Sequence, residues 1–145
     1  MISRAVAGGL LLFMGLPGLA SAQNRWAREV ADQLHHALNA ANAASGGQPL
    51  LNTKGTLNQE ESATFGVTLQ QGRHYAVIGV CDNDCPRLRL VVATSTNSEL
   101  AVERGSEGFP VIQFSPPVSA AYRIRVTVEE CRVNPCWFAV GIVPR

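Results

Sequence analysis

Two closely spaced cysteine pairs, in a chain that begins with an export signal, constrain the fold of this sequence more than any other feature. The pairs are Cys81/Cys85 and Cys131/Cys136, and the chain has only these four cysteines. Exported thiols meet an oxidising compartment, so we expect the cysteines to form two structural disulfides. The pairs therefore predict a small exported domain, periplasmic or secreted, in which the cysteines brace the fold and carry no chemistry.

The first 22 residues have the parts of a secretory signal peptide. Arg4 is an early positive charge, an apolar run follows over residues 9–14, and residues 20–22 read Ala-Ser-Ala, the small-x-small pattern that signal peptidase accepts. We therefore expect the exported chain to start at Gln23. No later stretch approaches the ~20 apolar residues of a transmembrane helix, so no membrane span is expected after signal removal.

Length and charge narrow the class of protein. Removing 22 of the 145 residues leaves 123, which fits one domain with a short appendage. Loss of Arg4 leaves 11 basic and 11 acidic residues, and no basic run occurs. A neutral chain of this kind argues against nucleic acid or an anionic membrane surface as the main partner.

Residues 23–45 are predicted to form an amphipathic helix. Its apolar stripe consists of Trp26, Val30, Leu34 and Leu38, which recur at spacings of four. Glycines at 46 and 47 end the helix and open a linker over residues 46–54. A narrow stripe on an alanine-rich helix must be buried to stay folded, either against its own β domain or against a second protein.

Beyond the linker, the periodicity becomes that of β-strands. The candidate strands are residues 64–69, 74–80, 87–93, 99–103, 111–114, 122–128 and 137–143. Turn-rich stretches separate them, which predicts an antiparallel jelly-roll-like β-sandwich of about seven strands over residues 55–145. The fold class is thus mainly β with one preceding helix, and the expected large core residues are Phe114, Tyr122, Trp137 and Phe138.

Four arginines alternate with apolar residues on two of these strands. They are Arg87, Arg89, Arg123 and Arg125. If the two strands are neighbours, the arginines form a basic face opposite the core, partly neutralised by the acidic residues at 129 and 130. A solvated sheet face is the simpler interpretation, and a specific anion site is the alternative.

Seven short motifs, in order, form a pattern shared with a known family. They are Gly55-Thr-Leu57, Phe65-Gly-Val-Thr-Leu69, Gly72-x-x-Tyr75, Cys81-Asp-x-Asp-Cys85, Pro110-Val-Ile, Tyr122-x-Ile-x-Val126 and Cys131-x-x-x-Pro-Cys136. The pattern resembles the bacterial pre-peptidase C-terminal (PPC-type) β-sandwich domain, in its small exported form with two cysteine pairs. The resemblance covers about residues 55–143 and implies a sandwich that accompanies secreted enzymes. Members of that family are usually non-catalytic, and some bind calcium or polymeric substrates.

The sequence departs from this family directly after the first cysteine pair. Relatives tend to have Asp-Leu-Asp-Leu there, whereas residues 87–90 read Arg-Leu-Arg-Leu. Only Asp82 and Asp84 remain nearby, and calcium usually takes six to eight oxygens. We therefore expect no metal and no cofactor, and we retain this aspartate loop as a possible binding element.

Local disulfide pairing, Cys81–Cys85 and Cys131–Cys136, is the favoured connectivity, because a turn brings each pair close enough to bond. Two alternatives remain open. The cysteines could pair across the two motifs, or all four thiolates could bind zinc, since the spacings loosely admit a zinc site.

The sequence contains no pattern of residues that indicates catalysis. The adjacent histidines at 35 and 36 point in different directions on a helix, and His74 has no acidic neighbour to orient it. No nucleophile elbow occurs, so we expect a protein that is not an enzyme.

The leading hypothesis is an exported, non-catalytic accessory or binding module of the cell envelope or secretome. Its partner would be an envelope or extracellular protein or polysaccharide, held by the aspartate loop, the arginine face or the helix stripe. The alternative is an inhibitor or immunity-type partner of an exported hydrolase, with residues 105–109 as a protruding loop.

Overall fold

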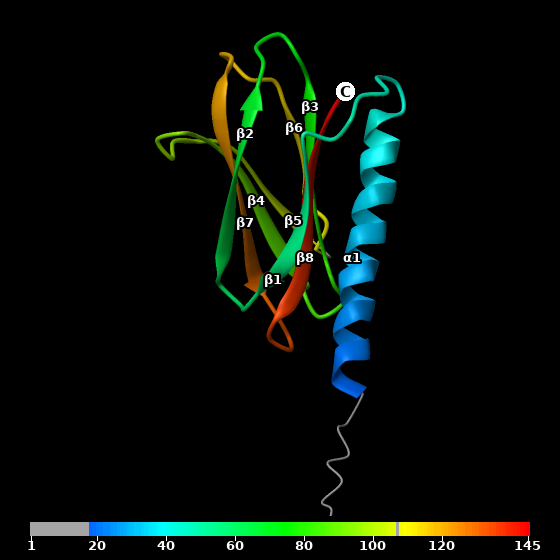
Figure 1. The fold of residues 1–145 in the computed structure, drawn as a ribbon. Coiled ribbons are helices and arrows are strands. Elements are labelled where there is room, and N and C mark those ends of the chain that lie inside the picture. The colour runs from blue at the N-terminus through cyan, green and yellow to red at the C-terminus, as the bar shows by residue number, and fades with distance from the viewer. Residues whose placement is uncertain (1–17, 107) are drawn as a thin grey trace, which may run out of the picture.

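Within residues 18–106 and 108–145, which the structure describes, one long helix lies against a sandwich of β-strands (Figure 1). The structure is a computed structural model. The helix and the eight described strands are α1 (Gly18–Asn42), β1 (Leu51–Leu57), β2 (Ser62–Leu69), β3 (Tyr75–Cys81), β4 (Arg87–Thr94), β5 (Glu99–Ser106), β6 (Val111–Phe114), β7 (Ala120–Glu130) and β8 (Cys136–Pro144). The described part of the chain contains no helix that is long and apolar enough to cross a bilayer.

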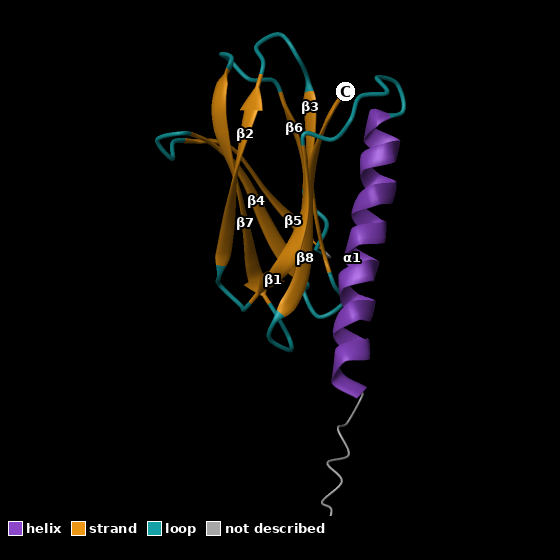
Figure 2. Ribbon diagram, viewed as in Figure 1, coloured by secondary structure: helices purple, strands orange, loops and turns teal. Residues whose placement is uncertain are grey.

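The strands form two four-stranded sheets, and the observed strand pairs are antiparallel. Sheet A has the order β1-β8-β3-β6, and sheet B has the order β2-β7-β4-β5. This arrangement confirms the predicted fold class, a mainly β antiparallel sandwich preceded by one helix. Figure 2 shows the resulting three layers, with the helix on sheet A and sheet B on the far side.

The sequence missed the first strand. Residues 51–54, assigned to the linker, begin β1, which pairs with β8 from Leu51 opposite Ile142 to Leu57 opposite Cys136. Side chains at alternate positions of β1 are half-buried, but Lys54 and Gly55 lower its β propensity. The sandwich consequently has one strand more than the seven that were predicted.

The core between the sheets comes from strands with period-two alternation. On β7 the inward side chains are Tyr122, Ile124, Val126 and Val128, all buried. They pack against inward residues of the facing sheet, including Phe114 and Phe138, as predicted for these large side chains. Phe114 and Tyr122 meet edge to face with ring centroids 5.5 Å apart.

A second apolar cluster lies between α1 and the outer face of sheet A. Val30, Leu34 and Leu38 are buried in it. Their partners are Ala76, Ile78 and Val80 of β3 with Ala139 and Val143 of β8. Strands β3 and β8 are therefore buried on both faces, which explains why their sequences are almost continuously apolar.

Trp137 lies in this outer cluster rather than in the core between the sheets. It is half-buried and packs against this outer cluster, so its predicted place among the large core residues is wrong. Neighbouring positions on a strand face opposite sides of the sheet, which sends Phe138 into the core and Trp137 toward the helix.

The helix boundaries differ slightly from those predicted. The C-terminal end comes at Asn42, three residues before the predicted one, and Gly46 follows with a φ of 64° that suits glycine. At the N-terminal end, α1 already includes residues 18–22, the last part of the predicted signal peptide. The rest of that peptide, residues 1–17, lies outside the described residues.

Candidate functional site

Four loops meet at one end of the sandwich, the lower end in Figure 1, and both disulfides lie there. These loops join β1 to β2, β3 to β4, β5 to β6 and β7 to β8, and together they are called the disulfide end. Cys81 is bonded to Cys85 and Cys131 to Cys136, each with Cα atoms 5.9 Å apart. The connectivity is the local one favoured from the sequence. Because the sulfurs are bonded to one another, the alternative of a zinc site with four thiolates is wrong.

Asp82, predicted as part of an exposed binding loop, is instead buried and structural. Its Oδ1 accepts a hydrogen bond from the backbone N–H of Asp84 at 3.1 Å, and its Oδ2 accepts one from Trp137 at 2.7 Å. Burial raises the pKa of the Asp82 carboxyl, and these two hydrogen bonds oppose the shift. The carboxylate therefore joins the β3–β4 loop to the start of β8, and the exposure expected of Asp82 is wrong.

Hydrogen bonds connect the loops to one another. Gln59 in the β1–β2 loop donates its backbone N–H to Asn134 Oδ1 at 2.9 Å, and its Oε1 accepts from the N–H of Cys131 at 3.1 Å. The backbone N–H of Arg132 donates to the carbonyl of Asp84 at 2.7 Å, which links the β7–β8 loop to the β3–β4 loop. Disulfides close the β3–β4 and β7–β8 loops, so the disulfide end has little freedom to rearrange.

The β5–β6 loop, the predicted protruding loop, is fixed to the first disulfide. The carbonyl of Gly108 accepts from the N–H of Cys81 at 3.1 Å. Gly108 has a φ of 71°, and a Cβ there would lie 2.6 Å from the Cys81 sulfur, so only glycine fits. Its neighbour Phe109 is 45% exposed. The loop thus presents one aromatic side chain from a rigid base.

Beside this end, a hollow of about 340 Å³ separates the helix from the β3–β4 loop. Its lining residues are Gln33, Cys81, Asp82, Asn83, Cys85, Pro86 and Arg132. The apolar stripe predicted for helix docking does not line this hollow, because sheet A covers Val30, Leu34 and Leu38. Of the two targets expected for this stripe, the chain's own β domain is the one observed, and an exposed docking surface made of these three residues is wrong. Trp26, the remaining residue of the stripe, is half-buried, with the Arg25 guanidinium 5.3 Å from its ring centroid.

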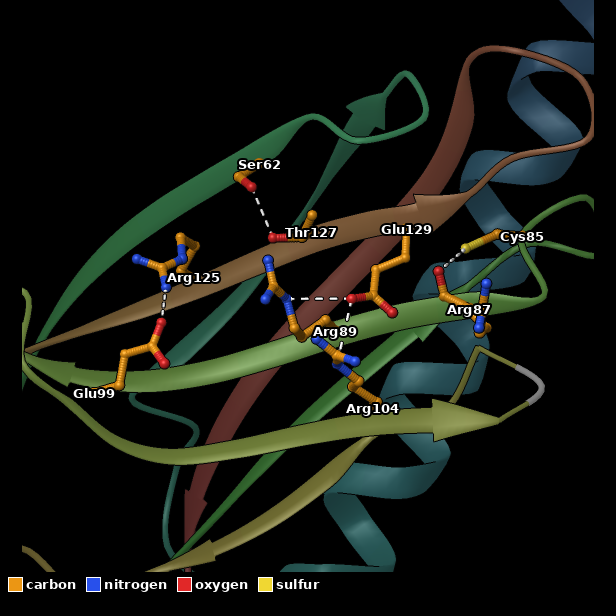
Figure 3. A network of polar contacts seen from close by, with 9 residues as sticks. All are labelled: Ser62, Cys85, Arg87, Arg89, Glu99, Arg104, Arg125, Thr127 and Glu129. Carbon is orange, nitrogen blue, oxygen red and sulfur yellow. Dashed lines mark hydrogen bonds and ion pairs between the residues drawn. The ribbon is translucent and has the colours of Figure 1, made fainter.

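The predicted arginine face exists, but acidic side chains such as Glu99 and Glu129 pair with several of its arginines (Figure 3). Strands β4 and β7 are neighbours, as the basic face requires. Arg87 pairs with Glu130 and Arg125 with Glu99, while Arg123 donates to Asn97 Oδ1 at 2.9 Å. The sequence missed Glu99 and Asn97 because they belong to β5 and the turn before it, which reach the arginines of β7 only across β4 in the folded sheet.

Arg89 has a different environment from the other three arginines. Its Nε lies 3.4 Å from Glu129 Oε1, and the Nε of Arg104 lies 3.4 Å from the same oxygen (Figure 3). Arg104 belongs to β5 and was not among the predicted site residues. A register in which Arg89 stands directly opposite Arg104 could have revealed the pair, but the sequence does not give that register.

None of the three histidines lies on the arginine face; the rings of His35 and His36 meet edge to face, with centroids 6.1 Å apart. His35 and His36 are exposed on the helix, and His74 contacts Ser115 Oγ through Nδ1 at 2.5 Å. Among residues 18–106 and 108–145, no group of three or more His, Cys, Asp or Glu side chains is arranged to hold a metal ion.

The architecture defines a class of protein, a disulfide-braced two-sheet β-sandwich. No family model matches the chain, and no curated protein sequence matches it either. Solved structures do resemble it. One is PliG of Aeromonas hydrophila, a periplasmic inhibitor of g-type lysozyme, with a TM-score of 0.51 and 14% identity over 70% of this chain and 90% of that one.

A second similar structure is the pre-peptidase C-terminal domain of the Bacillus anthracis collagenase. The TM-score is 0.52 and the identity 8%, over 64% of this chain and 88% of that domain. At such identities the likeness is one of fold alone. It supports a PPC-like fold, as the sequence motifs implied.

Proposed function

We propose that the protein is an exported, non-catalytic binding module that recognises its partner through the disulfide end. The partner would be a protein or polysaccharide of the cell envelope or the extracellular medium. Cleavage after residue 22 and an oxidising compartment, periplasmic or extracellular, are part of this proposal, because both disulfides need such a compartment to persist.

The observation that carries the proposal is the cross-linking of the four loops. Two disulfides and the hydrogen bonds of Gln59, Arg132 and Gly108 hold their backbones before any partner arrives. Loops that are already ordered lose less conformational entropy on binding, so more of the contact energy appears as affinity. An end built in this way is suited to recognition.

The disulfide end also exposes apolar side chains among polar ones. Val133 is 65% exposed in the β7–β8 loop, and Phe109 is 45% exposed in the β5–β6 loop. Exposed polar residues, including Asn58, Asn83 and Asn134, lie on the same loops. Apolar anchors within a polar rim are the usual anatomy of a protein-binding surface.

The test is an equilibrium binding survey of the purified protein against isolated envelope polysaccharides and exported proteins. For any ligand found, Val133→Asp should weaken binding at least tenfold. The matched control is Val118→Asp, since Val118 is 56% exposed at the opposite end of the sandwich. A survey without a ligand, or an equal loss from both variants, would overturn the proposal.

A second candidate function is inhibition of an exported hydrolase. Phe109 favours it, because this aromatic residue projects from a loop fixed at Gly108, a geometry that can enter a cleft without rearrangement. The resemblance to a lysozyme inhibitor supplies the first enzyme to assay, a g-type lysozyme. Inhibition that is lost in Phe109→Asp and kept in Val118→Asp would support this role. Full lysozyme activity in a large molar excess of the protein would argue against this target.

A further inference from the structure

An open hollow of about 420 Å³ lies on the outer face of sheet B, apart from the loop surface proposed above. It is lined by Glu60, Arg87, Arg89, Arg104, Thr127 and Glu129. Thr127 is buried, and its hydroxyl bonds to that of Ser62 at 2.7 Å, as Figure 3 shows. Every lining side chain is polar, and the volume falls within the range typical of small-molecule sites.

Two of the lining arginines stand side by side and share one carboxylate. Arg89 and Arg104 are direct cross-strand partners, and both approach the same oxygen of Glu129 at 3.4 Å. Like charges opposite each other destabilise a sheet. Two carboxylates line the hollow, and in the described structure only that of Glu129 forms an ion pair with either arginine. A bound anion between the two guanidinium groups would offset their repulsion.

Arg89 has unused capacity to donate hydrogen bonds. Its Nε is buried and has no hydrogen-bond acceptor among the described residues, although Glu129 Oε1 lies 3.4 Å away. A guanidinium offers five N–H donors, and its fork of paired nitrogens matches the two oxygens of a carboxylate. Arg104, whose side chain is 66% exposed, can bring a second fork to the same ligand.

Acceptors complete the hollow on its other side. Glu60 lies in the β1–β2 turn with a φ of 67°, a left-handed conformation that is unusual for glutamate. Backbone conformations of this kind concentrate at functional sites. Together with Glu129, it can accept hydrogen bonds from ligand hydroxyls next to the group that the arginines bind.

We propose that this hollow binds a carboxylate-bearing sugar residue of an acidic glycan. The two arginines would hold the sugar carboxylate, and the two glutamates would accept from its hydroxyls. The glutamates favour a ligand that carries hydroxyl donors beside a single negative charge, and they disfavour a phosphate group, which carries more negative charge. The site goes beyond the proposed recognition by the disulfide end.

The experiment uses the purified protein and trigalacturonate, a short oligomer of a carboxylated sugar, in titration calorimetry at low salt. Arg104→Ala should weaken binding at least tenfold, and its exposure makes a folding defect unexpected. Arg89→Lys, which keeps the charge but loses the fork, should also weaken it. The matched control is Arg123→Ala, which removes the same charge from the same face outside the hollow and should change the affinity less than about twofold.

Each further measurement decides the proposal. Absence of trigalacturonate binding to the wild type overturns it, as does an equal loss in Arg104→Ala and Arg123→Ala. A short polyglutamate that binds as tightly overturns the sugar assignment, and inorganic phosphate that competes equally well overturns the carboxylate. Val133→Asp should leave trigalacturonate affinity unchanged, so failure of the loop surface and failure of this hollow are distinguishable.

Discussion

The outer faces of the two sheets have opposite fates, although both belong to antiparallel four-stranded sheets of the same sandwich. Sheet A presents small and branched apolar residues outward, such as Ala76 and Ile78, and helix α1 covers them. Sheet B presents arginine and threonine outward, such as Arg125 and Thr127, and no helix among the described residues lies on it (Figure 1). The outward half of each strand therefore decides whether a sheet acquires a third layer.

Sheet B also protects its own outer face locally. Val91 has no exposed surface although it points away from the core between the sheets, where its neighbours Leu90 and Val92 lie. In the register it stands between Val102 and Arg125, and a long arginine stem can cover apolar surface while its charged end stays in water. Long polar side chains thus shield the apolar positions on the outer face of sheet B, whereas a helix covers the outer face of sheet A.

The largest expected effect concerns the covered face. Leu34→Ala should lower the free energy of unfolding by about 2–5 kcal/mol, because it removes a fully buried side chain between α1 and sheet A. The matched control is Leu100→Ala, the same change at a position that is 43% exposed on β5, and it should stay within about 0.5 kcal/mol. Urea unfolding of both variants measures the difference. Equal small losses would mean that the helix contributes little to stability.

A second prediction concerns Asp82, whose carboxylate is buried at the margin of the covered face. Asp82→Ala should cost about 1–3 kcal/mol, because it leaves the backbone N–H groups of Asp84 and Trp137 without their acceptor. Asp84→Ala is the control, since none of the hydrogen bonds in the described structure uses its side chain. The two unfolding midpoints in urea give the comparison. A similar loss in both variants would show that loop charge, rather than the hydrogen bonds, matters.

Much of the contrast between the outer faces of the two sheets could be predicted from the sequence. Spacings of four in the helix identified Val30, Leu34 and Leu38, and alternation on β7 separated Ile124 in the core from Arg125 outside. The continuous apolar runs of β3 and β8 indicate strands that are buried on both faces. Such strands need a packing partner on each side of the sheet. That signal could have placed the helix on sheet A.

The parts of the sites that were missed depend on pairing between distant segments. Asp82 is structural because the N–H of Trp137, 55 positions away, comes within 2.7 Å of it. Arg104 joins the hollow only because β5 pairs with β4 in a register that sets it opposite Arg89. Local patterns fix which face a side chain takes, whereas these contacts require the strand order and register of the folded sheet.

A third prediction concerns how the stability of the protein depends on pH. Burial raises the pKa of Asp82 above its unfolded value of about 3.9, so the folded state binds the proton more tightly. The stability that this group contributes is therefore present at low pH and decreases as the pH rises from about 4 through the raised pKa. Asp82→Asn lacks this titration, so the stability of the wild type relative to the variant should decrease over that range. Urea unfolding in steps between about pH 3 and 7 tests this, and an advantage that grows with pH would contradict it.

The smallest expected effect concerns the outer face of sheet B, which no helix of the described structure covers. Arg125 and Glu99 form an ion pair whose side chains are 28% and 46% exposed, so water screens their attraction. A double-mutant cycle on Arg125→Ala and Glu99→Ala should give a coupling of about 0.2–1 kcal/mol that declines as salt is added. A coupling well above this range and insensitive to salt would mean that the pair is desolvated. Sheet B would then have a cover in solution, such as a second copy of the chain, and the contrast between the two faces would disappear.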